Sequence, residues 1–200
     1  MRSLPTTEST RDGSTIVIRV LEPGDKPLLV EGLERMSEES RYRRFLSPKP
    51  SFTSAELAYL TEVDHHDHEA LIAVEPQSGE PVGVARYVRD AAQPHVAEAA
   101  LAVVDEWQHR GVGTALLRHL IARARQEDVR RFRTSVLGDN RAMLSLLDQP
   151  GLLPAGLESS GAGVQVAEFD LVPESGWRQL LDALRAAARG DLTFRMTRGS

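Results

Sequence analysis

Apolar residues are spaced along the chain in a way that predicts a mixed α/β protein. Short apolar and β-branched runs are typical of strands and occur at residues 15–20, 70–75, 81–88, 96–104, 132–136 and 164–172. Helical spacing appears in segments 25–36, 37–45, 53–62, 140–147 and 175–190, and after Gly113. Asp25, Ser37 and a Thr53–Glu56 capping box are expected to begin the first three of these helices. This order predicts an α/β fold of the α+β type, with a mostly antiparallel sheet flanked by helices.

The same pattern predicts one domain with loose ends. Residues 1–12 are polar and are expected to be a flexible N-terminus, and residues 13–173 hold all the predicted strands. Residues 174–190 are expected to form an extra amphipathic helix that packs on the domain or on a second copy, which leaves a homodimer open. Residues 191–200 are expected to be a flexible tail.

Composition narrows the classes of function. The chain has no cysteine, which excludes disulfides, a cysteine nucleophile and a cysteine-based zinc site. Its net charge of -5 argues against a general nucleic-acid binder. No apolar run approaches the roughly 20 residues of a membrane helix, and the N-terminus lacks the apolar segment of a signal peptide. We therefore expect a cytoplasmic protein with neither a nucleic-acid nor a membrane partner.

A loop with two glycines joins the apolar strand that ends near Val104 to the next helix. Gly111 and Gly113 lie where the first backbone N–H groups of a helix have no partner inside it. Such a turn can hold phosphate oxygens. The Rossmann pattern would need glycine where Leu116 stands, and a P-loop would need a nearby lysine, so neither nucleotide fold is indicated.

The pattern Gln108-x-x-Gly111-x-Gly113 resembles the acetyl-CoA-binding motif of the GNAT N-acetyltransferases. The order of elements over residues 15–172 agrees with that fold. Segments 37–45, 97–108 and 140–144 are similar to segments of the Pat-type protein lysine acetyltransferases. Those proteins often carry a cyclic-nucleotide-binding or acyl-CoA-synthetase-like module as well. This sequence has no room for either, so it resembles the catalytic domain alone.

The resemblance implies that acetyl-CoA is the acyl donor and that no metal takes part. The backbone near Leu101 and Val103 would pair with the pantetheine arm, and Asn140 would contact the cofactor beyond its pyrophosphate. The pyrophosphate would be held by N–H groups of Gln108, His109, Arg110, Gly111, Val112, Gly113 and Thr114.

Acetyl transfer to an amine requires the neutral amine, and Glu98 is the candidate base. A lysine has a pKa near 10.4, so deprotonation at neutral pH costs on the order of 4–5 kcal/mol. Glu98 interrupts an apolar strand, with the small residues Ala100 and Ala102 expected on its face. It also falls where Pat-type enzymes carry their catalytic glutamate. We expect direct attack of the amine on the thioester, with Glu98 acting directly or through water.

Many GNAT enzymes protonate the leaving thiolate with a tyrosine seven residues after the motif asparagine. Counting from Asn140 gives Leu147, and the tyrosines of this chain all lie upstream. The sequence therefore indicates no general acid. A protein that binds acyl-CoA as a sensor, without turnover, stays open for this reason.

The identity of the acceptor is left open as well, because a protein lysine, a small amine and a peptide N-terminus are all compatible with the sequence. Arg41, Arg43 and Arg44 could bind an acidic acceptor, although a solvated helical face is the simpler interpretation. Histidines and carboxylates at 64–68 are typical metal ligands, but consecutive residues would point to opposite faces of a strand. We expect a polar entrance to a strand there, which could border the acceptor site.

Overall fold

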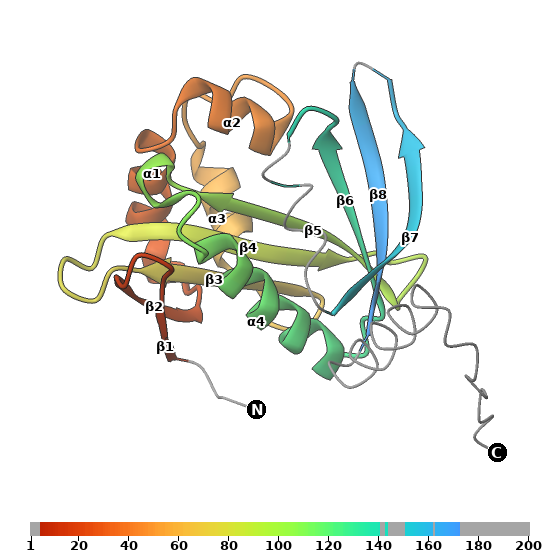
Figure 1. The fold of residues 1–200 in the computed structure, drawn as a ribbon, viewed down its shortest axis with the longest axis horizontal. Helices are drawn as coiled ribbons and strands as arrows, with labels where there is room; N and C mark the ends of the chain where they lie inside the picture. The colour runs from red at the N-terminus through yellow and green to blue at the C-terminus, as the bar shows by residue number, and fades with distance from the viewer. Residues whose placement is uncertain (1–4, 141–142, 144–150, 162, 173–200) are drawn as a thin grey trace, which may run out of the picture.

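A computed structural model describes residues 5–140, 143, 151–161 and 163–172. The described residues form an eight-stranded sheet in the order β1-β2-β3-β4-β5-β6-β8-β7 (Figure 1). Neighbouring strands run antiparallel, except that β5 and β6 are parallel. This confirms the predicted mixed, mostly antiparallel sheet. The strands are β1 Thr6–Ser9, β2 Thr15–Val20, β3 His68–Val74, β4 Pro81–Arg89, β5 Val96–Val103, β6 Arg131–Leu137, β7 Leu152–Ser159 and β8 Val164–Leu171.

Helices cover both faces of the sheet. Leu71 and Ala73 of β3 belong to the larger core, which includes the apolar face of α4, whereas Ala70 and Ile72 pack with α1 and α3. Because alternate residues of a strand point to opposite faces, α4 lies on one face and α1 and α3 lie on the other. The helices are α1 Lys26–Glu34, α2 Glu38–Phe45, α3 Ser54–Thr61 and α4 Val112–Gln126, with short 3-10 helices η1 Pro23–Asp25 and η2 Asp105–Trp107.

Local capping explains where two of the predicted helices begin. The Ser37 hydroxyl accepts a hydrogen bond from the backbone N–H of Ser40 at the start of α2. Thr53 and Glu56 form the predicted capping box of α3. Asp25 differs from expectation because its carboxylate binds the Arg19 guanidinium at 2.6 Å and the N–H of Glu22, so it does not cap α1.

The sheet opens between β5 and β6. Their parallel pairing covers only three residue pairs, which join 96–98 to 131–133, whereas β4 stays paired with β5 as far as Val103. The edge of β5 that faces β6 therefore has no strand partner from Ala99 to Val103 in the part of the chain that the structure describes. Figure 1 shows the two strands diverging toward α2. A ligand between them can reach free backbone groups.

Two strands were missed by the sequence interpretation. The expectation of a flexible N-terminus over residues 1–12 is wrong for β1, which pairs with β2. β7 contains Pro154 and Gly156, and its pairing with β8 shifts between them. Both are edge strands of polar or irregular sequence, and an edge strand tolerates such residues because one side makes no ladder bonds.

Two predicted helices, 140–147 and 174–190, lie largely or wholly outside the described residues, as does the predicted tail. None of the helices in the described part of the chain is long and apolar enough to cross a membrane.

Candidate active site

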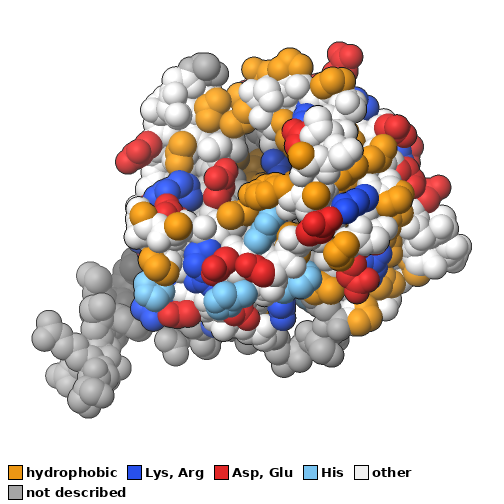
Figure 2. All heavy atoms as spheres, turned by 180° about the vertical axis from the view of Figure 1, so that it is seen from behind, with side chains coloured by type: hydrophobic (Ala, Val, Ile, Leu, Met, Phe, Trp, Pro, Cys, Tyr) orange, Lys and Arg blue, Asp and Glu red, His pale blue; other side chains and the backbone are white. Residues whose placement is uncertain are grey.

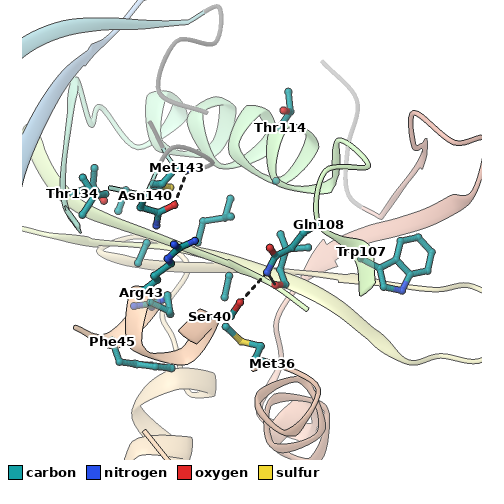
Figure 3. Close-up of a pocket in the computed structure, with 18 of the residues that line it drawn as sticks. Met36, Ser40, Arg43, Phe45, Trp107, Gln108, Thr114, Thr134, Asn140 and Met143 are labelled. Carbon is teal, nitrogen blue, oxygen red and sulfur yellow. Dashed lines mark hydrogen bonds between the residues drawn. The ribbon is translucent and has the colours of Figure 1, made fainter. Parts of the chain in front are cut away.

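A cavity of about 620 Å³ opens where β5 and β6 separate. Figure 3 shows it between α2, the start of α4, and the segment of Thr134, Asn140 and Met143. Of the residues predicted for the site, those that line it are Glu98, Leu101, Val103, Gln108, His109, Gly111, Gly113, Thr114 and Asn140. The structure thus brings the glycine loop, defined here as residues 108–114, and the proposed base to one cavity.

The backbone of the glycine loop is arranged as an anion site. His109 and Gly111 have positive φ angles of 61° and 91°. None of the backbone N–H groups from 109 to 114 donates to a backbone acceptor among the described residues. α4 begins at Val112, so its first N–H groups and its positive dipole end lie at this loop. The loop can therefore donate several hydrogen bonds to phosphate oxygens.

Side chains hold the glycine loop in place. The Gln108 amide nitrogen lies 3.2 Å from the Ser40 hydroxyl and 3.2 Å from the Val103 carbonyl, which ties the loop to α2 and β5 (Figure 3). Arg110 stacks on Trp107 at 5.1 Å and forms an ion pair with Asp12 at 3.1 Å. Two predicted residues thus contribute only backbone here, since the Arg110 side chain is engaged elsewhere and that of Val112 is buried in the core.

Asn140 lies across the cavity from the glycine loop. Its side-chain oxygen accepts a hydrogen bond from the backbone N–H of Met143 at 3.1 Å (Figure 3). This contact is typical of a residue that caps the start of a helix, and both residues line the cavity.

Glu98 lies on β5 at the point where β6 departs. Its side chain is exposed, whereas Ala97 and Ala99 on the opposite face are buried. It makes no hydrogen bond or ion pair with any of the described residues. Its cross-strand neighbour on β4 is Val88, and Ala100 follows on its face. An uncommitted carboxylate beside small and apolar neighbours leaves room for a substrate amine.

The three arginines of α2 have different surroundings. Arg41 donates to the backbone carbonyls of Met36 and Glu34, and Arg43 forms an ion pair with Glu39 at 2.6 Å. Arg43 and Arg44 both line the cavity, and the Arg44 guanidinium lies 5.0 Å from the centre of the neighbouring Phe45 ring. Burial lowers the pKa of Arg44, and the Glu98 charge opposes that shift.

The histidine-rich segment 64–68 is a polar strand entrance, as expected. The Asp64 carboxylate accepts hydrogen bonds from the backbone N–H groups of residues 66, 67 and 68. His65 binds the fully buried Glu69 at 2.7 Å, and His68 faces Arg86 at 3.2 Å. Within the described residues, no three metal-ligating side chains come together.

Sequence reasoning missed several lining residues. Arg11, in the turn between β1 and β2, lies against the glycine loop: its N–H donates to the Arg110 carbonyl at 2.8 Å. A Cβ on Gly111 would lie 3.3 Å from the Arg11 Cγ. Nothing in the local sequence indicates this contact, because it depends on an unexpected strand pairing. Other lining residues missed are Met36, Ser40, Phe45, Leu46, Ala99, Trp107, Thr134, Ser135, Val136 and Met143.

Comparison with known proteins gives a consistent result. Residues 34–149 match the model of the acetyltransferase (GNAT) family. Acetyltransferase Pat of Mycolicibacterium smegmatis is 35% identical over 188 residues, which is 92% of this chain and 55% of that protein. The chain therefore spans about half the length of that relative.

Solved structures agree with the sequence matches. The GNAT domain of Streptomyces lividans PAT is 35% identical, with a TM-score of 0.75 over 83% of this chain and 96% of that one. A protein of Salmonella typhimurium, solved with its cofactor acetyl-CoA, is 17% identical, with a TM-score of 0.62 over 78% of this chain and 92% of that one, and it shows a common fold alone. The resemblance predicted from the motifs is confirmed.

Proposed function

Because the chain belongs to the GNAT family of acetyltransferases, we propose that it transfers the acetyl group of acetyl-CoA directly to a primary amine. One observation carries this proposal. A single cavity is lined by the free N–H groups of the glycine loop, the unpaired edge of β5 and the uncommitted carboxylate of Glu98. These are the groups that a phosphate, an extended amide-containing arm and an amine would each require.

The donor would lie along the β5 edge. The glycine loop would hold the pyrophosphate, and the backbone at Leu101 and Val103 would hydrogen-bond to the amides of the pantetheine arm as an additional strand would. Asn140 would lie beside the cofactor beyond its pyrophosphate. Arg11 makes no side-chain hydrogen bond or ion pair with any of the described residues, which leaves its guanidinium available to a CoA phosphate.

Glu98 would act at the acceptor. Its carboxylate takes a proton from the ammonium group, and the amine nitrogen then attacks the thioester carbonyl carbon. The new C–N bond forms, the C–S bond breaks, and CoA leaves as a thiolate that takes a proton from water. A general base of this kind is worth about 10²–10⁴-fold in rate. The sequence offers Leu147 where related enzymes place a tyrosine, and that position lies outside the described residues.

We favour a protein lysine as the acceptor, because the segments around Glu98 and Asn140 are similar to those of Pat-type enzymes. A small amine or a peptide N-terminus is the alternative. Three statements remain predictions from the sequence: a cytoplasmic location, no nucleic-acid or membrane partner, and a possible homodimer.

The test is incubation with acetyl-CoA and a mixed panel of proteins, peptides and small amines, followed by mass spectrometry and thiol detection. We expect acetylated product together with free CoA in equal amounts. Acetyl-CoA that raises the thermal unfolding midpoint without acetylating any acceptor would instead identify a non-catalytic acyl-CoA sensor.

A further inference from the structure

Arg44 on α2 and Arg86 on β4 have no acidic partner within salt-bridge distance among the described residues. We infer that the acceptor carries a carboxylate near its amine and that Arg44 binds this carboxylate. The inference rests on the proposed function and adds the class of acceptor. The carboxylate could belong to an acidic residue beside a target lysine or to a small amino acid, and the two sources share the same chemistry.

Arg86 forms the back of this site. It lies on β4 with 6% of its surface exposed, and its guanidinium donates to the Leu60 carbonyl at 3.1 Å and faces the His68 Nε2 at 3.2 Å. Burial and then the Arg86 charge lower the pKa of His68 to about 4, so this histidine is neutral at pH 7. No carboxylate among the described residues lies within ion-pair distance of Arg86. Its positive charge therefore stays uncompensated by a direct partner.

Arg44 lines the cavity, whereas Arg86 does not. It contacts the Phe45 ring but makes no hydrogen bond or ion pair with any of the described residues. Burial and the charge of Arg44 lower the pKa of Arg86 to about 10, which indicates that the two guanidinium groups repel each other. Arg43 also lines the cavity but is paired with Glu39, and Arg41 donates to backbone carbonyls, so among the described residues Arg44 is the α2 arginine without a partner.

The Glu98 carboxylate is the negative charge that acts on Arg44. One carboxylate leaves a net positive charge across Arg44, Arg86 and Glu98, and desolvated charges are unfavourable unless they are paired. In the proposed reaction Glu98 takes up a proton, so its negative charge is lost when the amine is activated. A carboxylate on the acceptor would then supply the missing charge.

The positions of these residues in the sheet fit such an acceptor. Val88 is the cross-strand neighbour of Glu98, and Arg86, two residues before it, is the neighbour of Ala100. Arg86 and Glu98 thus share one face on adjacent strands, with Arg44 above them on α2. Figure 2 shows a hollow on this side of the molecule with hydrophobic side chains around it. An amine at Glu98 would lie within reach of a group held by Arg44.

Matched acceptors that differ in one charge provide the first test. Nα-acetyl-lysine is compared with its amide, and the peptide acetyl-Glu-Lys-Gly-amide with acetyl-Gln-Lys-Gly-amide. We expect kcat/KM to be about tenfold or more higher for the acidic member of at least one pair, as for a charge-assisted hydrogen bond. The first pair tests whether the carboxylate belongs to a small amino acid. The second pair tests whether it belongs to an acidic residue beside a target lysine.

Arg44→Met should remove this preference, so that the ratio of kcat/KM between the acidic and the neutral member of each pair falls to about one. Arg43 lines the same cavity but is paired with Glu39, so the Arg43→Met variant should retain the preference. Equal rates for both members of each pair in the unmodified protein would overturn the inference alone. If no acceptor is acetylated and no CoA is released, the proposed function fails and the inference fails with it.

Thermal unfolding without substrate gives a readout besides activity. Methionine keeps the unbranched apolar stem and removes the charge. We expect Arg44→Met to raise the unfolding midpoint, because it removes an unpaired, partly buried cation, and we expect glutarate to stabilise the unmodified protein more than the variant at equal ionic strength. A midpoint that falls by several degrees, with no differential effect of glutarate, would show that Arg44 is satisfied within the protein.

Discussion

The proposed donor and acceptor sides of the cavity are built from different kinds of atoms. The donor side consists of backbone groups, namely the N–H groups of residues 109–114 and the unpaired edge of β5. The proposed acceptor side consists of charged side chains: Glu98 on β5 and Arg44 on α2 line the cavity, and Arg86 on β4 lies outside its lining. A backbone site requires a defined chain path, whereas a side-chain site requires that separate elements come together.

This difference has a consequence for the effect of substitutions. Most side chains on the donor side can change without loss of the hydrogen-bond donors, as long as the loop keeps its conformation. On the acceptor side each charge is carried by one side chain, so a single substitution removes it. Donor binding and acceptor chemistry should therefore be separable by mutation.

Glu98→Gln is expected to show the largest effect, a loss of acceptor chemistry with donor binding retained. Without the carboxylate no base takes the proton from the ammonium group, so kcat should fall by about 10²–10⁴-fold. Acetyl-CoA affinity, measured by isothermal titration calorimetry, should change less than about twofold, since the donor contacts are backbone groups. Glu34→Gln, an exposed glutamate outside the cavity, is the matched control. A variant that retained full activity would remove Glu98 from the mechanism.

Gly111→Val is expected to have the opposite effect, a loss of donor binding with acceptor preference retained. Gly111 has a φ of 91°, a conformation that costs a β-branched residue about 1–3 kcal/mol, and a Cβ there would lie 3.3 Å from the Arg11 Cγ. Relaxation of this strain would turn N–H groups away from the phosphates and weaken acetyl-CoA binding by about tenfold.

Gly24→Val is the control, because a Cβ at Gly24 meets nothing within 4 Å. The preference among acceptors should be the same in Gly111→Val as in the unmodified protein. A loss of acceptor preference together with donor affinity would contradict the proposed separation of the two sides.

The same contrast explains what the sequence could predict. The glycine loop is one continuous segment whose strand, glycines and helix are all visible in order, and eight of the ten proposed cofactor residues line the cavity. Glu98 was proposed because it breaks an apolar strand and falls where Pat-type enzymes carry their catalytic glutamate, and it lines the same cavity. The capping residues Ser37 and Thr53 were likewise found from local patterns.

Contacts between distant segments could not be predicted in this way. Arg11 reaches the glycine loop only because β1 pairs with β2, and β1 is too polar to be recognised as a strand. Arg86 lies in an apolar segment that predicts a strand. The sequence does not indicate that Arg44 lies near it. The sequence indicated that Arg41, Arg43 and Arg44 could bind an acidic acceptor or form a solvated helical face, and only the fold distinguishes Arg44 from Arg41.

Arg11→Ala should weaken acetyl-CoA binding by less than Gly111→Val does. An exposed guanidinium that binds one phosphate is partly screened, so we expect acetyl-CoA affinity to fall by about three- to tenfold at low salt and less at high salt. Arg11 could bind either the pyrophosphate or the 3′-phosphate of CoA. If it binds the 3′-phosphate, Arg11→Ala should not change the affinity for 3′-dephospho-CoA. Arg125→Ala, in the last turn of α4, is the control.

The smallest effect is expected from His68, which belongs to the acceptor side through its contact with Arg86. Burial and then the Arg86 charge lower its pKa from 6.5 to about 4. Between pH 6.5 and 4 the unfolded chain therefore binds a proton that the folded chain does not. Stability that this histidine contributes above pH 6.5 is lost as the pH falls through that window, by on the order of 1–2 kcal/mol after discount for solvent screening.

Replacement of His68 by glutamine keeps an acceptor for Arg86 but removes the titration. The fall in the thermal unfolding midpoint from pH 6.5 to pH 4 should then be shallower in His68→Gln than in the unmodified protein. His95→Gln, whose ring lies on the surface beside Asp128, should show the unmodified slope. Parallel slopes for the unmodified protein and His68→Gln would mean that His68 does not feel the Arg86 charge, and the acceptor side would then hold less uncompensated positive charge than we infer.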